Sequence, residues 1–177
     1  MSQSEATDNG EEESSSSLTL DDLVRGIDLL KQKFPFFTSI GIWVTLQGYW
    51  HCISPSSALA HEYTLFPCAF RKEQGDNTTN SHLPLFEHWP RFWKDYFTAL
   101  KAAGITFVKV DNQAYIDTLT EGEEEAKIKA YGQAVMSKAA QEVFGDGMVH
   151  CMSQSGRFVA GEFGLGVDPT SVGAVAR

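Results

Sequence analysis

Apolar segments of strand length alternate with amphipathic segments along this chain, and this order limits the fold more than any other feature. The apolar segments are residues 39–45, 105–111 and 148–153. The amphipathic segments, in which apolar residues recur at helical spacing, are residues 18–35, 89–104 and 123–145. Helices that alternate with strands are typical of a parallel sheet with crossover helices. We therefore predict an α/β fold.

The expected helices carry signals at their ends. Thr19 is a good N-cap, and the two aspartates that follow it suit the positive end of the helix dipole. Pro35 ends the first helix, because the residue before a proline disfavours helical backbone. Gly104 and Gly145 stand where a C′ glycine ends the second and third helices.

Composition describes a globular, acidic chain. Its 177 residues, 42% of them hydrophobic, fit a single folded domain. A net charge of −9 argues against nucleic acid or an anionic membrane as the partner. Residues 1–17 are rich in Ser and Glu and contain no Lys or Arg, so we expect a disordered acidic tail. This start lacks the features of a signal peptide, which favours a cytoplasmic location.

Residues 46–87 contain scattered glycines and prolines without clear periodicity. We expect a long irregular loop there, and such loops in compact domains are often functional. The three cysteines, Cys52, Cys68 and Cys151, are too widely spaced for a disulfide framework or a zinc site. We therefore expect no metal or cofactor.

The strand 105–111 ends on two charged residues. Side chains alternate between the faces of a strand, so Phe107, Lys109 and Asp111 share one face while Val108 and Val110 share the other. The carboxyl ends of parallel strands are where active sites of α/β enzymes collect. The alternative is a structural ion pair at the strand end. The pattern favours an active site built around Lys109 and Asp111.

Three segments together carry a family resemblance. "SIGIWVTLQGYWHCISP" (39–55), "GITFVKVDNQ" (104–113) and "VHCMSQ" (149–154) resemble the raffinose synthase and seed imbibition protein branch of glycoside hydrolase family 36. That branch includes alkaline α-galactosidases and galactosyltransferases that act on raffinose-type oligosaccharides. The resemblance covers about residues 18–154, and the KVDNQ segment is its most specific part.

The resemblance implies roles for the charged pair. Asp111 corresponds to the nucleophile of a retaining glycosidase, and Lys109 to a lysine that binds galactose hydroxyls. A nucleophilic carboxylate must be ionised, and a neighbouring ammonium favours the ionised form. The implied partner is a galactose-containing oligosaccharide.

Aromatic residues near the first strand are candidates for sugar contact. Trp50 follows a strand end, and we predict that its flat face contacts substrate, while for Tyr49 substrate contact and packing are equally good interpretations. Trp43 lies within the strand, and we predict that it is a core residue. Cys151, at the end of the third strand, could line the same site, although most such cysteines serve packing.

Two parts of the family pattern have no counterpart. These are an acidic segment that grips galactose and a later segment that supplies the acid/base. A complete (β/α)8 barrel needs at least about 200 residues. We therefore predict an incomplete barrel over residues 18–154, followed by a divergent, weakly structured end at 155–177. Exposed strand edges would then allow self-association.

These features leave several functional interpretations open. The first is a galactosidase or galactosyltransferase segment whose activity alone is weak or absent, because one catalytic carboxyl group is missing. The second is an inactive remnant with at most a binding role. The third, an unrelated barrel enzyme with Lys109 as a Schiff-base amine, is disfavoured because Asp111 would stabilise the ammonium form.

Overall fold

The computed structural model describes residues 19–48, 52–71, 79–120 and 122–151, with α helices, short 3-10 helices (η) and strands. In chain order the elements are α1 (Leu20–Lys33), β1 (Gly41–Thr45), α2 (Leu59–Glu62), β2 (Leu65–Phe70), β3 (Thr79–Pro84), η1 (Phe86–His88), α3 (Trp89–Ala102), β4 (Phe107–Asp111), η2 (Gln113–Thr118), α4 (Glu123–Phe144) and β5 (Met148–His150). The acidic tail expected at 1–17 and the weakly structured end expected at 155–177 lie outside the described residues.

The main sheet is parallel, as the order of the segments predicted. Its strands lie in the order β1-β4-β5, with Val44 opposite Val110 and Val110 opposite His150. The strands therefore advance across the sheet in chain order, and each neighbouring pair is joined by a crossover that contains a long helix, α3 or α4.

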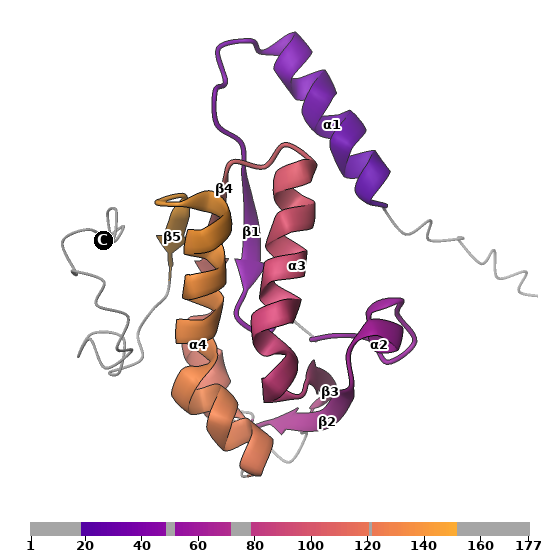
Figure 1. The fold of residues 1–177 in the computed structure, drawn as a ribbon, viewed down its shortest axis with the longest axis vertical. Coiled ribbons are helices and arrows are strands. Elements are labelled where there is room, and N and C mark those ends of the chain that lie inside the picture. Colours follow the sequence, from indigo (N-terminus) through magenta and orange to yellow (C-terminus); the bar gives the residue numbers. More distant parts are fainter. Residues whose placement is uncertain (1–18, 49–51, 72–78, 121, 152–177) are drawn as a thin grey trace, which may run out of the picture.

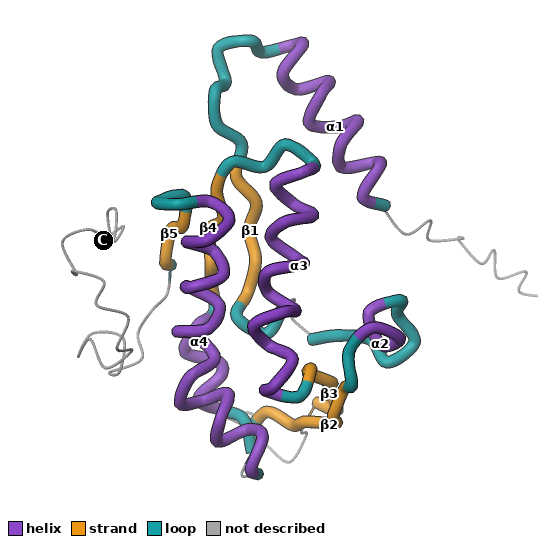
Figure 2. Tube along the Cα trace, viewed as in Figure 1, coloured by secondary structure: helices purple, strands orange, loops and turns teal. Residues whose placement is uncertain are grey.

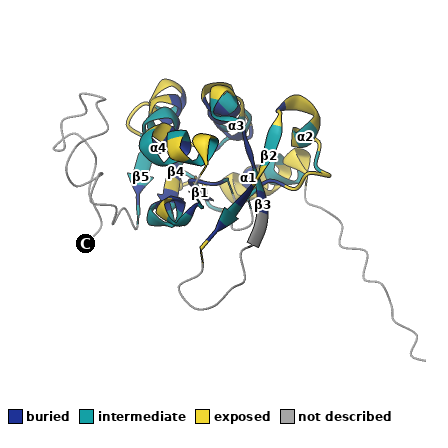
Figure 3. Ribbon diagram, turned by 90° about the horizontal axis from the view of Figure 1, so that it is seen from below, coloured by how far each residue is buried: buried dark blue, intermediate teal, exposed yellow. Residues whose placement is uncertain are grey.

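The long helices α3 and α4 lie side by side over the same face of the sheet (Figures 1 and 3). Val108 and Val110 of β4 point toward them and are fully buried. The α3 side of this core consists mainly of aromatic residues, including Trp93 and Phe97. The expected division of β4 into an apolar face and a face with Lys109 and Asp111 is thus confirmed by burial.

The helix ends follow the expected signals. Thr19 caps α1 in a reciprocal pair of hydrogen bonds with Asp22. Gly104 and Gly145 have φ of 97° and 62°, a region that glycine enters without steric cost. Gly145 follows α4 directly, and Ala103 stands between α3 and Gly104. Among the described helices, none is both long and apolar enough to cross a membrane.

The region 46–87 is not the irregular loop that we expected. It contains the short helix α2 and an antiparallel hairpin, β2–β3, in which Leu65 lies opposite Pro84 (Figure 2). Its sheet has two strands, so both are edge strands, where proline is tolerated. Pro67 and Pro84 argued against strands in the sequence, and the apolar alternation there is weak. The hairpin was therefore not predicted.

Helix α1 projects away from the sheet (Figure 1). Ile27 is its buried residue and lies against the turn at Gly104. Several apolar side chains on α1 and in the turn after it are exposed: Leu20, Leu29, Leu30, Phe36 and Phe37.

Candidate active site

Asp111 is the last residue of β4 and lies at the carboxyl end of the parallel sheet. Residues that face each other in a parallel pair point to the same side of the sheet. Trp43 faces Lys109 and Thr45 faces Asp111 in the register of β1 and β4. These four side chains therefore occupy the face of the sheet opposite α3 and α4.

Both oxygens of the Asp111 carboxylate accept a hydrogen bond. The indole Nε1 of Trp43 donates to Oδ2 at 2.9 Å, and the backbone N–H of Asn112 donates to Oδ1 at 2.7 Å. Asn112 adopts the left-handed conformation, with φ 54° and ψ 32°. This turn ends the strand and directs the Asn112 N–H toward the side chain before it. An ionised carboxylate has about four acceptor positions, so further positions remain for a ligand.

The pKa of Asp111 is held below its usual value. The largest cause is the hydrogen bond from Trp43, followed in the same direction by the Asn112 N–H, the charge of Lys109 and the side chain of Cys151. Partial burial acts the opposite way, because it penalises the charged form. Donors outweigh burial here, so Asp111 is a carboxylate at neutral pH.

The structure brings together three of the residues that we singled out. Lys109 is exposed and acts on Asp111 through its charge. Cys151 follows β5, is half-buried, and its side chain makes a small contribution to the lowered pKa of Asp111. Tyr49 and Trp50 lie outside the described residues.

Trp43 is the residue that we misassigned. We expected a core tryptophan, yet the side chain is half-buried and donates to Asp111. Alternation along 41–45 was the available signal, because Val44 is the buried neighbour and Trp43 therefore points to the other face. What the sequence lacked was the register that sets Trp43 opposite Lys109.

The hairpin is attached to the segment that follows Asp111. Phe70 of β2 forms a bridge with Leu119, and its ring stacks on Tyr115 of η2 with centroids 4.6 Å apart. Two backbone hydrogen bonds flank this contact, from Arg71 N to Thr118 O and from Thr120 N to Ala69 O. The long β1–α3 connection therefore packs beside the carboxyl end of β4.

Comparison with known proteins assigns the chain to a family. The sequence profile described as raffinose synthase or seed imbibition protein Sip1 matches residues 4–162, a longer stretch than the 18–154 that the motifs indicated. A comparison with curated proteins finds no match. The profile covers most of the chain, including every element of the described fold. The chain therefore belongs to the raffinose synthase or seed imbibition protein Sip1 family.

Proposed function

We propose that Asp111 is the nucleophile of a retaining reaction that transfers a galactosyl group from a raffinose-type oligosaccharide. The observation that carries this proposal is an ionised carboxylate at the carboxyl end of a parallel strand, fixed by the Trp43 and Asn112 donors. A nucleophilic carboxylate must be both charged and held in place, and these contacts meet both needs.

In this reaction the Asp111 carboxylate attacks the anomeric carbon while the bond from that carbon to the leaving oxygen breaks. A second carboxyl group gives the leaving oxygen its proton, and the product is a galactosyl ester of Asp111. Water then completes hydrolysis, or a sugar hydroxyl completes transfer, with the second carboxyl group now acting as the base.

The surrounding side chains would bind the sugar. Lys109 is exposed beside the nucleophile, and its ammonium can donate to galactose hydroxyls. The aromatic faces of Tyr49 and Trp50 would contact the apolar side of the sugar ring. Cys151 would line the wall of the site next to Asp111.

The fold supports the further proposal that this sheet is part of a (β/α)8 barrel. Its strands follow chain order, and both crossover helices cover one face, whereas doubly wound sheets have helices on both faces. In a barrel, the face that carries Asp111 would be the interior.

We also propose that the chain alone acts poorly on natural oligosaccharides. The described groups that shift the pKa of Asp111 in either direction include no carboxyl group, so none of them can serve as the acid/base. An inactive protein that only binds galactosides is the second candidate, and the same observation favours it.

A galactosyl fluoride with a second fluorine on the ring separates these candidates. Fluoride leaves without a protonated acid: Asp111 bonds to the anomeric carbon, the carbon–fluorine bond breaks, and fluoride departs with the bonding pair. The ring fluorine slows breakdown of the ester, so the labelled protein accumulates and intact mass spectrometry detects it. Peptide mapping should place the label on Asp111.

Asp111→Asn should abolish labelling. Asp117→Asn is the matched control, because Asp117 is an exposed carboxylate six positions further along the chain. Absence of label from folded wild-type protein that still binds galactosides would sink the nucleophile proposal and leave the binding role. Label on Asp117 or on any other carboxylate would also contradict it.

A further inference from the structure

The side chain of Gln113 is almost completely buried beside Asp111. Gln113 is the first residue of η2, and 2% of its surface is exposed. Its Nε2 lies 3.2 Å from Val110 O and 3.2 Å from Cys151 O, and donates to both. Val110 lies near the carboxyl end of β4, and Cys151 directly follows β5.

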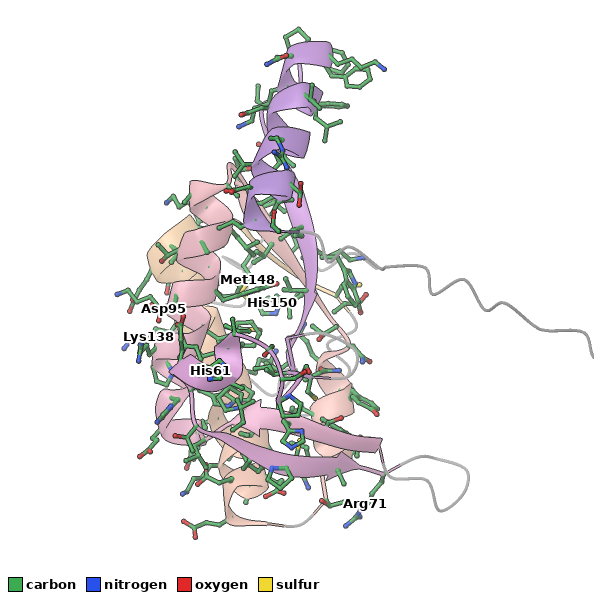
Figure 4. The ribbon with its side chains drawn as sticks, turned by 90° about the vertical axis from the view of Figure 1, so that its right-hand side faces the viewer. His61, Arg71, Asp95, Lys138, Met148 and His150 are labelled. Carbon is green, nitrogen blue, oxygen red and sulfur yellow. The ribbon has the colours of Figure 1, made fainter. Side chains whose placement is uncertain are left out.

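The other end of the same amide is also fully used. Gln113 Oε1 accepts a hydrogen bond from Gln133 Nε2 of α4. It also lies 3.1 Å from His150 Nδ1 of β5, which donates when the ring proton is on Nδ1. Figure 4 shows His150 inside the molecule, close to Met148 on the same strand. A primary amide has two donor hydrogens and two acceptor positions, and all four are satisfied here.

This pattern determines how the amide is oriented. The reverse orientation would place Oε1 against the carbonyl oxygens of Val110 and Cys151, with no hydrogen between them. It would also turn the amide hydrogens toward Gln133 Nε2, another donor. A buried amide turned that way would lose its hydrogen bonds, at a cost of about 1–3 kcal/mol for each unsatisfied group.

The amide of Gln113 supplies a hydrogen bond at the end of β4, where the backbone pairing with β5 stops. The Cys151 N–H donates to Val110 O at 2.8 Å and, among the described residues, forms the last backbone rung between β4 and β5. The chain then turns left-handed at Asn112, whose N–H serves Asp111 and not the ladder. The Gln113 side chain supplies the next donor, to Cys151 O. It thus takes the place of a backbone rung that the turn removes.

We propose that Gln113 is a positioning residue for Asp111. Its amide joins the carboxyl ends of β4 and β5 and holds the left-handed turn at Asn112, which directs the carboxylate toward Trp43. Gln133 and His150 orient the amide through their contacts with Gln113 Oε1. The catalytic consequence of this arrangement rests on the proposed function, whereas the positioning itself does not.

The Trp43 indole hydrogen reports the position of Asp111 without any substrate. Its NMR signal can be assigned as the indole signal that disappears in Trp43→Phe. Protonation of Asp111 removes the charge that this hydrogen faces, so the signal shifts with pH and its midpoint follows the pKa of Asp111.

Gln113→Leu should raise that midpoint toward the ordinary aspartate value, because the Asn112 and Trp43 donors lose their alignment. Labelling by the galactosyl fluoride should fall about 10- to 100-fold, as expected when a reacting group is misplaced by about 1 Å. Gln113→Glu keeps the length of the side chain, and the neutral acid can still donate one hydrogen bond. Its titration midpoint should therefore lie between those of the wild-type protein and Gln113→Leu. Leu100→Ala is the stability control, since Leu100 is buried near the opposite end of the sheet, where its carbonyl accepts from Ile105 N.

An unchanged midpoint in folded Gln113→Leu, or an equal change in Leu100→Ala, would overturn the positioning role. If Gln113→Leu does not fold, Gln133→Leu gives the same test, because it removes one donor to Gln113 Oε1 and should produce a smaller rise. A raised midpoint supports the inference even where wild-type protein takes no label, a result that would count against the proposed function alone.

Discussion

At the scale of single residues, Asp111 is kept ionised mainly by neighbouring N–H groups and less by Lys109, the charged residue two positions before it. The Trp43 indole is the largest influence, and the charge of Lys109 ranks below the Asn112 N–H. Lys109 is exposed, and water weakens the effect of a charge there. The Trp43 indole thus affects the ionisation of Asp111 more than Lys109 does, which is compatible with the sugar-binding role proposed for Lys109.

Trp43→Phe should therefore raise the pKa of Asp111. Only the carboxylate attacks, so the acid limb of the labelling rate should move to higher pH. The fall in rate should be confined to pH values near and below the ordinary aspartate pKa of 3.8, because at higher pH Asp111 is ionised in both proteins. Labelling kinetics followed across pH measure this. Trp93→Phe is the control: that indole Nε1 is buried and, among the described residues, has no hydrogen-bond partner.

His150 should make folding stability depend on pH. Burial lowers the pKa of His150 to about 4, while the unfolded chain titrates near 6.5. Between these values the unfolded state binds more protons, so stability is complete above about 6.5 and is lost as the pH falls toward 4. The loss should be on the order of 2–3 kcal/mol.

Urea unfolding between pH 7.5 and 4.5 tests this expectation. His150→Asn keeps a donor toward Gln113 Oε1 and does not titrate, so its stability should fall less over the same range. Equal losses in wild type and variant would assign the pH dependence to other groups and contradict the prediction.

At the scale of elements, the packing of α3 on α4 depends on a glycine. A Cβ built on Gly132 of α4 would lie 2.7 Å from Cζ3 of Trp89. The Trp89 ring cannot move away easily, because it is buried and its Nε1 donates to Pro84 O at 2.9 Å. Gly132 therefore lowers the intrinsic stability of α4 but allows α3 and α4 to approach closely.

Two matched glycine substitutions separate these effects. Alanine favours a helix interior by roughly 0.5–1 kcal/mol over glycine. Gly26→Ala in α1 should show this gain, because nothing lies within 4 Å of its added Cβ. Gly132→Ala should instead destabilise the protein by about 1–3 kcal/mol through overpacking. Denaturant unfolding measures both, and stabilisation by Gly132→Ala would show that the Trp89 contact is loose.

At the scale of the whole molecule, the described surface combines strand edges with exposed apolar side chains. β1 and β5 are the outer strands of the sheet, and each has one unpaired edge there. Leu29, in the C-terminal half of α1, and Phe36, in the turn after it, are 65% and 70% exposed. Both features promote association.

Self-association should therefore grow with concentration and depend on the α1 region. The double substitution Leu29→Gln with Phe36→Ser should lower the apparent mass in sedimentation velocity while changing stability by less than about 0.5 kcal/mol. Tyr131→Ser, a control for an exposed aromatic residue on α4, should change neither. Association that persists in the double variant would point to the edges of β1 and β5.

The sequence by itself determined the local features of this protein. Strand and helix periodicity, the Thr19 cap and the glycines after α3 and α4 act over a few residues, so they can be read directly. The same holds for the division of β4 into a valine face and a Lys109–Asp111 face. The motifs in these segments also indicated the family, which the profile match confirmed.

Only the tertiary structure decided which residues meet at the site. Trp43 and Asp111 are 68 positions apart, and their contact depends on the register between β1 and β4. The role of Gln113 likewise depends on where β5 and α4 bring Cys151, Gln133 and His150. The position of the hairpin beside β4 likewise involves the contact of Phe70 with Tyr115, which are far apart in the chain. Long-range pairing leaves no local pattern, because each partner's side chain is compatible with several environments until the strands align.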